Sequence, residues 1–139
     1  MRISITVPGE PVAKARPRFT KSGHVYTPVK TARFEQRVRL YAMAVMKGRK
    51  ILTGAVRLTV TAFFPIPKSW TLTQKAKAMS GALRHTKRPD SDNLCKAVQD
   101  ALNGTVYADD AQIDDVHIIK RYGIPRTEII VEAEDVDLV

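Results

Sequence analysis

The sequence is poor in several residue types, and each shortage excludes a class of protein. Cys95 is the only cysteine, which rules out an intrachain disulfide and a cysteine-based zinc site. No apolar run approaches the roughly 18 residues of a membrane-spanning helix, so no contact with a membrane is expected. The first residues, MRISITVPGE, lack the apolar segment of a secretory signal, and together with the lone thiol this favours a cytoplasmic protein.

Acidic residues are also scarce, and they are unevenly placed. The chain carries 23 Lys and Arg against 14 Asp and Glu, a formal net charge of +9. A polyanion, and nucleic acid first of all, is the partner to consider for such a chain. Residues 2–50 contain only two acids, Glu10 and Glu35, whereas every aspartate lies between Asp90 and Asp137. A basic chain that concentrates its acids needs a reason for doing so.

Hydrophobic periodicity predicts one α+β domain over residues 1–139, with helices packed on a small mixed or antiparallel β-sheet. Thr27 is expected to cap the first helix, with Pro28 at its first helical position. Ser69 or Thr71 is expected to cap a short helix that ends near Gly81. The other expected elements are strands at 2–7, 56–64, 116–122 and 127–133, a loose hairpin within 12–27, a first helix ending before Gly48, an amphipathic helix at 92–103 and a loop at 105–112.

The informative stretch begins just before the helix expected at 92–103. Asp90 and Asp92 lie two residues apart in a non-helical lead-in, so both carboxylates can point into one space. Further along, Asp92, Lys96 and Asp100 follow one another at intervals of four. Residues at this spacing share one face of a helix, so the three form a polar stripe opposite the apolar face.

Ordinary structural roles also explain this pattern. Aspartate is common where a helix starts, because it caps free N–H groups and suits the helix dipole; this accounts for one of Asp90 and Asp92. The stripe along the helix can be a surface ion-pair ladder of little energetic weight. Asp109 and Asp110, in the loop after the helix, can be plain loop polarity. The pattern alone leaves both interpretations open.

Other carboxylate motifs fit less well. An EF-hand loop starting at Asp90 would need Asp or Asn at its fifth position and Gly at its sixth, where Leu94 and Cys95 stand. The Asp90-Ser91-Asp92 triplet matches the Asp-x-Asp of nucleotide-sugar transferases, but those enzymes usually need a larger nucleotide-binding domain. The sequence contains no P-loop, no G-x-S-x-G and no H-E-x-x-H, and its three histidines are scattered.

Taken together, the residues in and around this helix resemble the core motif of the RusA-type Holliday-junction resolvases. The resemblance covers roughly residues 85–122. It comprises Arg88, Pro89, Asp90, Asp92, Asn93, Leu94, Lys96, Ala97, Asp100, Ala101, Leu102, Tyr107, Asp109, Asp110, Ala111, Gln112 and Lys120. The phage-borne branch of that family is further resembled by Lys14-Ala15-Arg16-Pro17-Arg18-Phe19, Tyr26-Thr27-Pro28, Pro67-Lys68-Ser69-Trp70 and His85.

The resemblance implies a crossover junction endodeoxyribonuclease that resolves four-way DNA junctions by paired nicks in recombination and repair. It implies metal ligands at Asp90, Asp92 and Asp110 and an essential lysine at Lys96, and these four form the expected catalytic set. It also implies Mg²⁺, for which Mn²⁺ can substitute, a homodimer, and no small-molecule cofactor. The chemistry suits these residues, because Mg²⁺ takes hard oxygen ligands and offsets charge that builds up on phosphorus.

Further residues are assigned supporting roles from their positions. Asp100, one turn beyond Lys96, is expected to orient it, and Asp109 is expected to support the loop. Lys120, on the next strand, is expected to touch phosphate. The remaining DNA contacts are expected to reach backbone phosphates rather than bases. The cations expected to make them are Lys14, Arg16, Arg18, Lys21, Lys87 and Arg88.

Two other functions stay open at this point. One is a Mg²⁺ nuclease that prefers flaps or forks to four-way junctions. The other is a basic nucleic-acid-binding protein without catalysis, whose acids are only caps and solubility charges. The substitution Asp92→Asn separates the enzyme from the binding protein, because it should abolish cleavage and leave binding intact.

Overall fold

The computed structural model describes residues 1–15, 18–26 and 28–134, and for Arg18 the backbone alone. The elements expected from the sequence are present, and β5 begins three residues earlier than expected. In chain order they are β1 (Arg2–Pro8), β2 (Arg18–Phe19), β3 (Val25–Tyr26), α1 (Val29–Met46), β4 (Val56–Phe64), α2 (Leu72–Ser80), α3 (Ser91–Leu102), the 3-10 turn η1 (Asp110–Gln112), β5 (Ile113–Tyr122) and β6 (Arg126–Ala133).

The four long strands form one mixed sheet in the order β1-β6-β4-β5. β6 pairs antiparallel with both β1 and β4, whereas β4 pairs parallel with β5. A parallel pair needs a long crossover connection, and the segment carrying α2 and α3 supplies it. β5 and β6 follow each other in the chain but are not neighbours in the sheet, because β4 lies between them.

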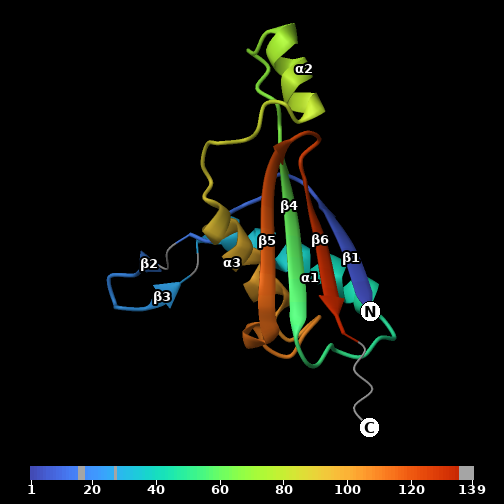
Figure 1. The fold of residues 1–139 in the computed structure, drawn as a ribbon. Coiled ribbons are helices and arrows are strands. Elements are labelled where there is room, and N and C mark those ends of the chain that lie inside the picture. Colours follow the sequence, from blue (N-terminus) through green and yellow to red (C-terminus); the bar gives the residue numbers. More distant parts are fainter. Residues whose placement is uncertain (16–17, 27, 135–139) are drawn as a thin grey trace.

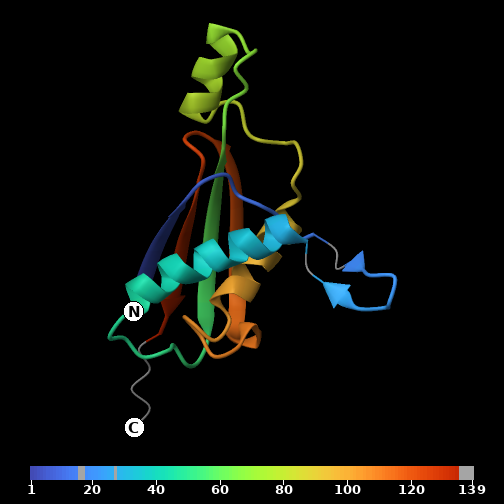
Figure 2. The same ribbon diagram turned by 180° about the vertical axis from the view of Figure 1, so that it is seen from behind.

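Helices α1 and α3 cover the same face of the sheet, and the opposite face carries no helix (Figures 1 and 2). Strand alternation decides which side chains meet the helices. Residues of β4 alternate between buried and more exposed positions along its whole length, as expected for a strand with one covered face. The main core forms where Ile5, Leu58 and Ile129 meet Phe34 of α1 and Val98 of α3.

The start of α1 differs slightly from the expectation. Pro28 stands at the N-cap and the helix begins at Val29, so the prediction of Pro28 as the first helical residue is wrong by one position. Proline lacks an N–H group, but the helix loses no hydrogen bond at either position, because an N–H at the N-cap or at the first helical residue has no partner within the helix. Thr27, the expected cap, lies outside the described residues.

Helix α2 stands beyond one end of the sheet (Figure 1). Thr71 caps it as expected: its hydroxyl accepts a hydrogen bond from the Gln74 N–H at 3.2 Å, and Gln74 Oε1 accepts one from the Thr71 N–H at 3.0 Å. Gly81 ends the helix at a φ of 83°, a left-handed conformation that glycine adopts readily. A second, smaller core beneath α2 contains Ala78, Phe64 and Leu94.

The hairpin of β2 and β3 projects sideways from the body of the molecule, beside the start of α3 (Figures 1 and 2). Its two short strands pair antiparallel, as expected from the turn signal around Gly23. Across the described residues, no helix has the length and apolar character that crossing a membrane requires.

Candidate active site at the start of helix α3

The two aspartates at the start of α3 are exposed and have no partner among the described residues. Asp90 occupies the N-cap position, yet its side chain makes no capping hydrogen bond. Asp92 lies in the first turn, and among the described residues its carboxylate has neither a hydrogen bond nor an ion pair. Helix capping therefore does not explain Asp90. The helix dipole favours negative charge at this end of α3, which is compatible with both carboxylates.

Lys96 pairs with Asp100 rather than with Asp92. Its Nζ lies 3.2 Å from Asp100 Oδ1, on the exposed side of α3. A continuous ladder along the polar stripe is therefore not formed. The expectation that Asp100 orients Lys96 is compatible with this contact. The Lys96 side chain remains 54% exposed, which leaves the ammonium group accessible to a ligand.

Lys14 belongs to the same ion-pair network. Its Nζ lies 2.6 Å from Glu35 Oε1 on α1 and 3.2 Å from Asp100 Oδ2 on α3. Burial by itself lowers the pKa of Lys14, but the hydrogen bonds and charges of Glu35 and Asp100 outweigh it and raise the pKa above its ordinary value. In the structure, this cation joins α1 to α3, a role that the sequence did not indicate.

The loop aspartates lie beside α3, in and next to η1, which is close to the lower part of that helix in Figures 1 and 2. The Tyr107 hydroxyl donates a hydrogen bond to the Gln99 carbonyl at 2.9 Å and so holds this loop against α3. Burial, and then the nearby charges of Asp110 and Asp109, raise the pKa of Tyr107. Gln112 fixes η1 by accepting from the Asp109 N–H at 2.9 Å and donating to the Leu52 carbonyl at 3.0 Å.

The structure does not gather the three predicted ligands into one group. Among the residues that it describes, which include Asp90, Asp92 and Asp110, no cluster of three or more His, Cys, Asp or Glu side chains is arranged to hold a metal ion. Asp90 and Asp92 are at the beginning of a 12-residue helix about 18 Å long, and η1 lies further along it. The donor chemistry of the Asp90 and Asp92 pair nevertheless fits Mg²⁺, which commonly takes one or two carboxylates and fills its other positions with water and phosphate oxygens.

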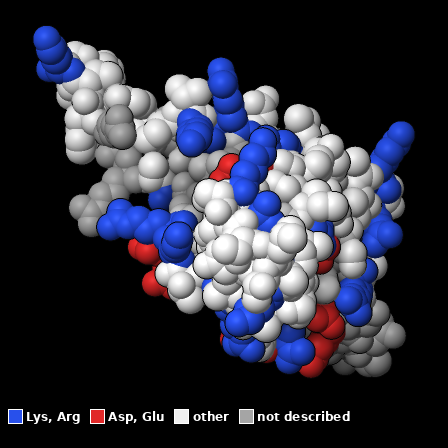
Figure 3. All heavy atoms as spheres, turned by 90° about the horizontal axis from the view of Figure 1, so that it is seen from above, with Lys and Arg blue, Asp and Glu red and all other residues white. Residues whose placement is uncertain are grey.

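Basic side chains surround this region. Lys and Arg side chains are spread across the end of the molecule that Figure 3 shows, with few acidic ones among them. Lys87 and Arg88, just before Asp90, are both exposed, as is Lys21 in the hairpin. Lys120 donates a hydrogen bond to the Lys87 carbonyl and so ties the segment before α3 to β5.

Two of the predicted DNA-binding cations have no described side chain. Arg16 lies outside the described residues, and only the backbone of Arg18 is described. Their assignment, like that of the other expected site residues, stays a prediction.

A cavity of about 400 Å³ lies directly beside the start of α3. Its lining includes Lys87, Arg88 and Pro89, and it extends to His85 and to Lys30 at the start of α1. The sequence gave no reason to single out Lys30, which is one of many cations in the first fifty residues. The topology brings it here, because α1 and α3 pack against each other.

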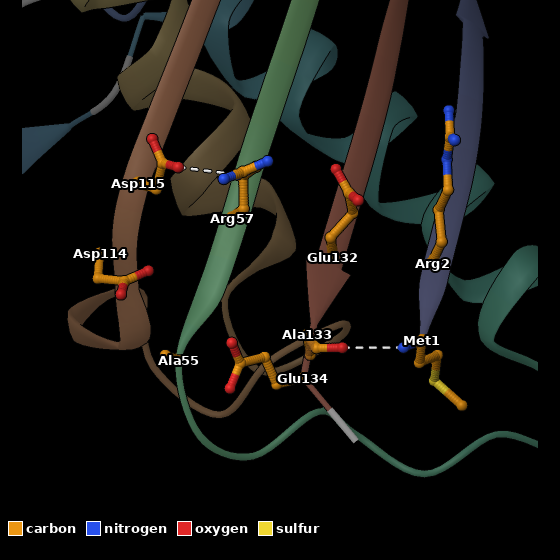
Figure 4. Close-up of a pocket in the computed structure, with 9 residues that line it drawn as sticks. All are labelled: Met1, Arg2, Ala55, Arg57, Asp114, Asp115, Glu132, Ala133 and Glu134. Carbon is orange, nitrogen blue, oxygen red and sulfur yellow. Dashed lines mark hydrogen bonds and ion pairs between the residues drawn. The ribbon is translucent and has the colours of Figure 1, made fainter. Parts of the chain in front are cut away.

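A second cavity, of about 430 Å³, lies at the opposite end of the sheet (Figure 4). Four carboxylates line it: Asp114, Asp115, Glu132 and Glu134. Asp115 is already paired there, because Arg57 Nε lies 2.7 Å from its Oδ2; His117 Nε2 also lies 3.0 Å from its Oδ1. The sequence assigned none of these residues a role.

Comparison with known proteins points to the same family as the residues around α3. A family model described as endodeoxyribonuclease RusA matches residues 8–132, which include every described element apart from part of β1 and the last residue of β6. The uncharacterized protein YqaN of Bacillus subtilis (strain 168) is 42% identical over 135 residues, covering 93% of this chain and 94% of that protein. The family match spans α1, β4, β5, nearly all of β6 and the whole segment from Lys87 to Lys120. The chain therefore belongs to the RusA endodeoxyribonuclease family.

Proposed function

We propose that the protein is a Mg²⁺-dependent endonuclease that resolves four-way DNA junctions by paired nicks. Family membership indicates an endodeoxyribonuclease. The finer proposal rests on the carboxylates of Asp90 and Asp92 at the start of α3, which have no partner within the described part of a chain of net charge +9. Free carboxylates in a cationic protein that binds a polyanion need a counter-charge, and a divalent cation supplies it.

Each catalytic residue has a distinct role in this proposal. Asp90 and Asp92 would hold Mg²⁺, with Asp110 as the third candidate ligand. A bound Mg²⁺ supplies an activated water and offsets negative charge on the scissile phosphate. Lys96, one turn beyond Asp92, contributes its accessible ammonium group to the charge that develops on the phosphate in the transition state. Asp100 holds Lys96 in place through the contact at 3.2 Å.

Binding energy for the DNA comes from cations that carry little sequence information. Lys87 and Arg88 are adjacent to the carboxylates, and Lys21 extends the basic surface along the hairpin. Each phosphate that such a cation neutralises releases counterions and steepens the dependence of affinity on salt. Charge of this kind positions the duplex arms and leaves the recognition of the branch to their geometry.

The expected homodimer follows from the shape of the substrate. A four-way junction is nearly two-fold symmetric and requires two nicks on two strands. A dimer with two-fold symmetry offers two equivalent sites that match it. The local Mg²⁺ chemistry does not depend on this step, so the oligomeric state needs its own measurement, by light scattering with and without junction DNA.

A cleavage assay on three matched substrates tests the proposal. Four-way junction, fork and linear duplex of the same sequence are incubated with the protein in Mg²⁺ and in EDTA. We expect paired nicks in the junction, much slower cutting of the other two, and no product in EDTA. Equal cutting of all three would leave a general flap or fork nuclease. Binding without any metal-dependent nicking would leave a basic nucleic-acid-binding protein.

A further inference from the structure

The cavity beside the start of α3 is lined by apolar residues, which we call its wall, and by three aromatic residues, which we call its floor. Four prolines belong to the wall: Pro11, Pro65, Pro67 and Pro89. Phe64, His85 and Tyr122 form the floor, with the Phe64 and His85 rings stacked at 4.1 Å and the His85 and Tyr122 rings edge to face at 5.1 Å. Phe64 and Tyr122 also belong to the small core beneath α2, which holds their rings in place. Aromatic rings held in place within a largely apolar lining suit a planar ligand.

Two polar groups on the floor have no partner within the described residues. His85 Nδ1 is buried and makes no hydrogen bond. The Tyr122 hydroxyl makes none either. A buried polar atom without a partner is destabilising, so it commonly marks a place where water or a ligand completes the bonding. Of the two, only His85 Nδ1 is buried; the Tyr122 hydroxyl is open to a ligand, and both residues line this cavity.

The rim of the cavity is positively charged. Lys30, Lys87 and Arg88 line it, and we call them the rim cations. Glu10 is the one acid among the described lining residues. Lys87 Nζ also lies 5.8 Å from the centre of the Trp70 ring, which helps to hold it at the rim. The volume of about 400 Å³ falls within the range of sites that take small molecules.

We infer that this cavity binds one unpaired nucleotide of the DNA substrate, with its base on the aromatic floor and its phosphate among the rim cations. The inference rests on the proposed cleavage of branched DNA. Pro89, in the cavity lining, is followed directly by Asp90, so an occupant would lie next to the candidate catalytic residues. A branch point supplies such a nucleotide more easily than a duplex, because its bases are less firmly stacked and cost less to extrude.

A binding experiment tests whether the base of this nucleotide contacts the floor of the cavity. Four-way junctions are prepared in which each nucleotide around the branch is replaced in turn by an abasic analogue. Dissociation constants are measured in EDTA by fluorescence anisotropy for the wild type, His85→Ala, Tyr122→Phe and His117→Ala. His117 is a matched control, since it is exposed and lies on the sheet away from this cavity.

We expect one abasic position to weaken wild-type binding about tenfold, the effect of losing one stacked base. The same abasic junction should bind His85→Ala no more weakly than the intact junction does, whereas His117→Ala should respond like the wild type. Tyr122→Phe keeps the ring and the packing but removes the hydroxyl, so it tests the floor even if His85→Ala does not fold. The abasic position should therefore weaken junction binding by Tyr122→Phe less than it weakens binding by the wild type.

Two outcomes would overturn the inference. Either no abasic position affects the wild type, or the effect is equally large in the wild type and in both floor variants. If Lys87→Ala bound every junction more weakly by the same factor and no abasic position had an effect, the cavity would hold phosphate alone. Cleavage of the intact junction in Mg²⁺ is measured on the same preparations. Its absence refutes the proposed function, whereas normal cleavage without an abasic effect refutes the nucleotide cavity alone.

Discussion

Carboxylates gather in two regions of this molecule, the start of α3 and the end of the sheet shown in Figure 4. The end of the sheet has more acids and the slightly larger cavity, about 430 Å³ against about 400 Å³. There, however, Asp115 is already paired with Arg57 and contacts His117. At the start of α3, the carboxylates have no partner among the described residues, while an accessible lysine lies one turn away.

The difference shows that neither the number of acids nor the size of a cavity identifies a site in this fold. What distinguishes the α3 region is that its carboxylates and its cations remain available to a ligand. Asp90 and Asp92 have no partner in the part of the chain that the structure describes, and Lys87 and Arg88 are exposed beside them. A phosphodiester needs both signs of charge within reach, because metal ligands and phosphate-binding cations act on the same group.

The largest expected effect separates the two acidic regions directly. Asp92→Asn should lower the rate of junction cleavage by on the order of 10²–10³-fold, because it removes a ligand for the divalent ion and with it charge stabilisation in the transition state. Junction binding in EDTA should be retained or strengthened. Asp114→Asn, in the cavity of Figure 4, is the matched control and should cleave at the wild-type rate. An equal loss of cleavage rate in both variants would show that the two acidic regions do not differ in this way.

Asp110 is tested in the same way but answers a different question. Asp110→Asn should lower the rate of junction cleavage as much as Asp92→Asn does if η1 contributes a ligand in the working enzyme. Full activity of Asp110→Asn would restrict the metal ligands of this chain to the start of α3, in line with the arrangement of the described residues.

The next effect concerns the lysine of α3. Lys96→Met should slow cleavage by about a hundredfold under saturating enzyme, because a charge that acts in the transition state is lost. Lys96 is 54% exposed, so its removal should leave folding intact. Lys47→Met, an exposed cation after the end of α1, controls for the loss of one positive charge. A change in affinity with an unchanged rate at saturation would contradict the catalytic role.

A smaller effect is expected on the free energy of unfolding, when an ion pair near α3 is broken and the result is compared with the loss of one in the cavity of Figure 4. Lys14→Met should lower the free energy of unfolding by about 2 kcal/mol, between the values of exposed and buried pairs, because Glu35 is only 13% exposed and loses its partner. Arg57→Met should cost less than about 1 kcal/mol, since the Arg57 side chain is 55% exposed. Urea denaturation at pH 7 measures both, and equal losses would refute the comparison.

Raising the pH offers an independent check on Lys14. Its pKa is raised in the folded protein, so its contribution is fully present below the ordinary lysine pKa of 10.5 and is lost as the pH rises through the folded value. The stability difference between the wild type and Lys14→Met should therefore narrow at high pH.

The smallest effect is a change in the dependence of stability on pH. Burial, and then the charges of Lys120 and Lys87, lower the pKa of His85 below its ordinary value of 6.5. The unfolded chain therefore takes up this proton more readily than the folded one, so the free energy of unfolding falls as the pH drops below about 6.5. His85→Phe removes this contribution, and its stability should fall less steeply between pH 7 and pH 5.5. Equal slopes would contradict the shifted pKa.

Much of the fold was predictable because its signals are local. Alternation along β4 and helical spacing in α3 each depend on residues a few positions apart, and the buried residues of both elements are those that the patterns indicate. Thr71 and Gly81 likewise set the ends of α2 through contacts within the helix itself. The order of the strands was not predictable in this way, because the insertion of β6 between β1 and β4 depends on pairing between distant segments.

The candidate site was predictable in its residue types but not in its arrangement. The motif from Arg88 to Lys120 singled out the aspartates and Lys96, whose roles stay predictions, while the family that it resembles is the one to which the chain belongs. Which carboxylates stand free, and which lysines are paired, depends on packing between α1 and α3. Lys14 illustrates this, since its neighbours Glu35 and Asp100 are 21 and 86 positions away along the chain.

By itself, the sequence determined the charge of the protein, its α+β class and the segment that resembles the family motif, because composition, periodicity and motif are all properties of nearby residues. Only the tertiary structure decided that Lys14 is engaged in an ion pair, that Asp90 and Asp92 have no partner among the described residues, and that Lys30 and His85 line one cavity. Those outcomes depend on which surfaces of distant elements come into contact, and that is set by how the sheet and its two helices exclude water from a shared core.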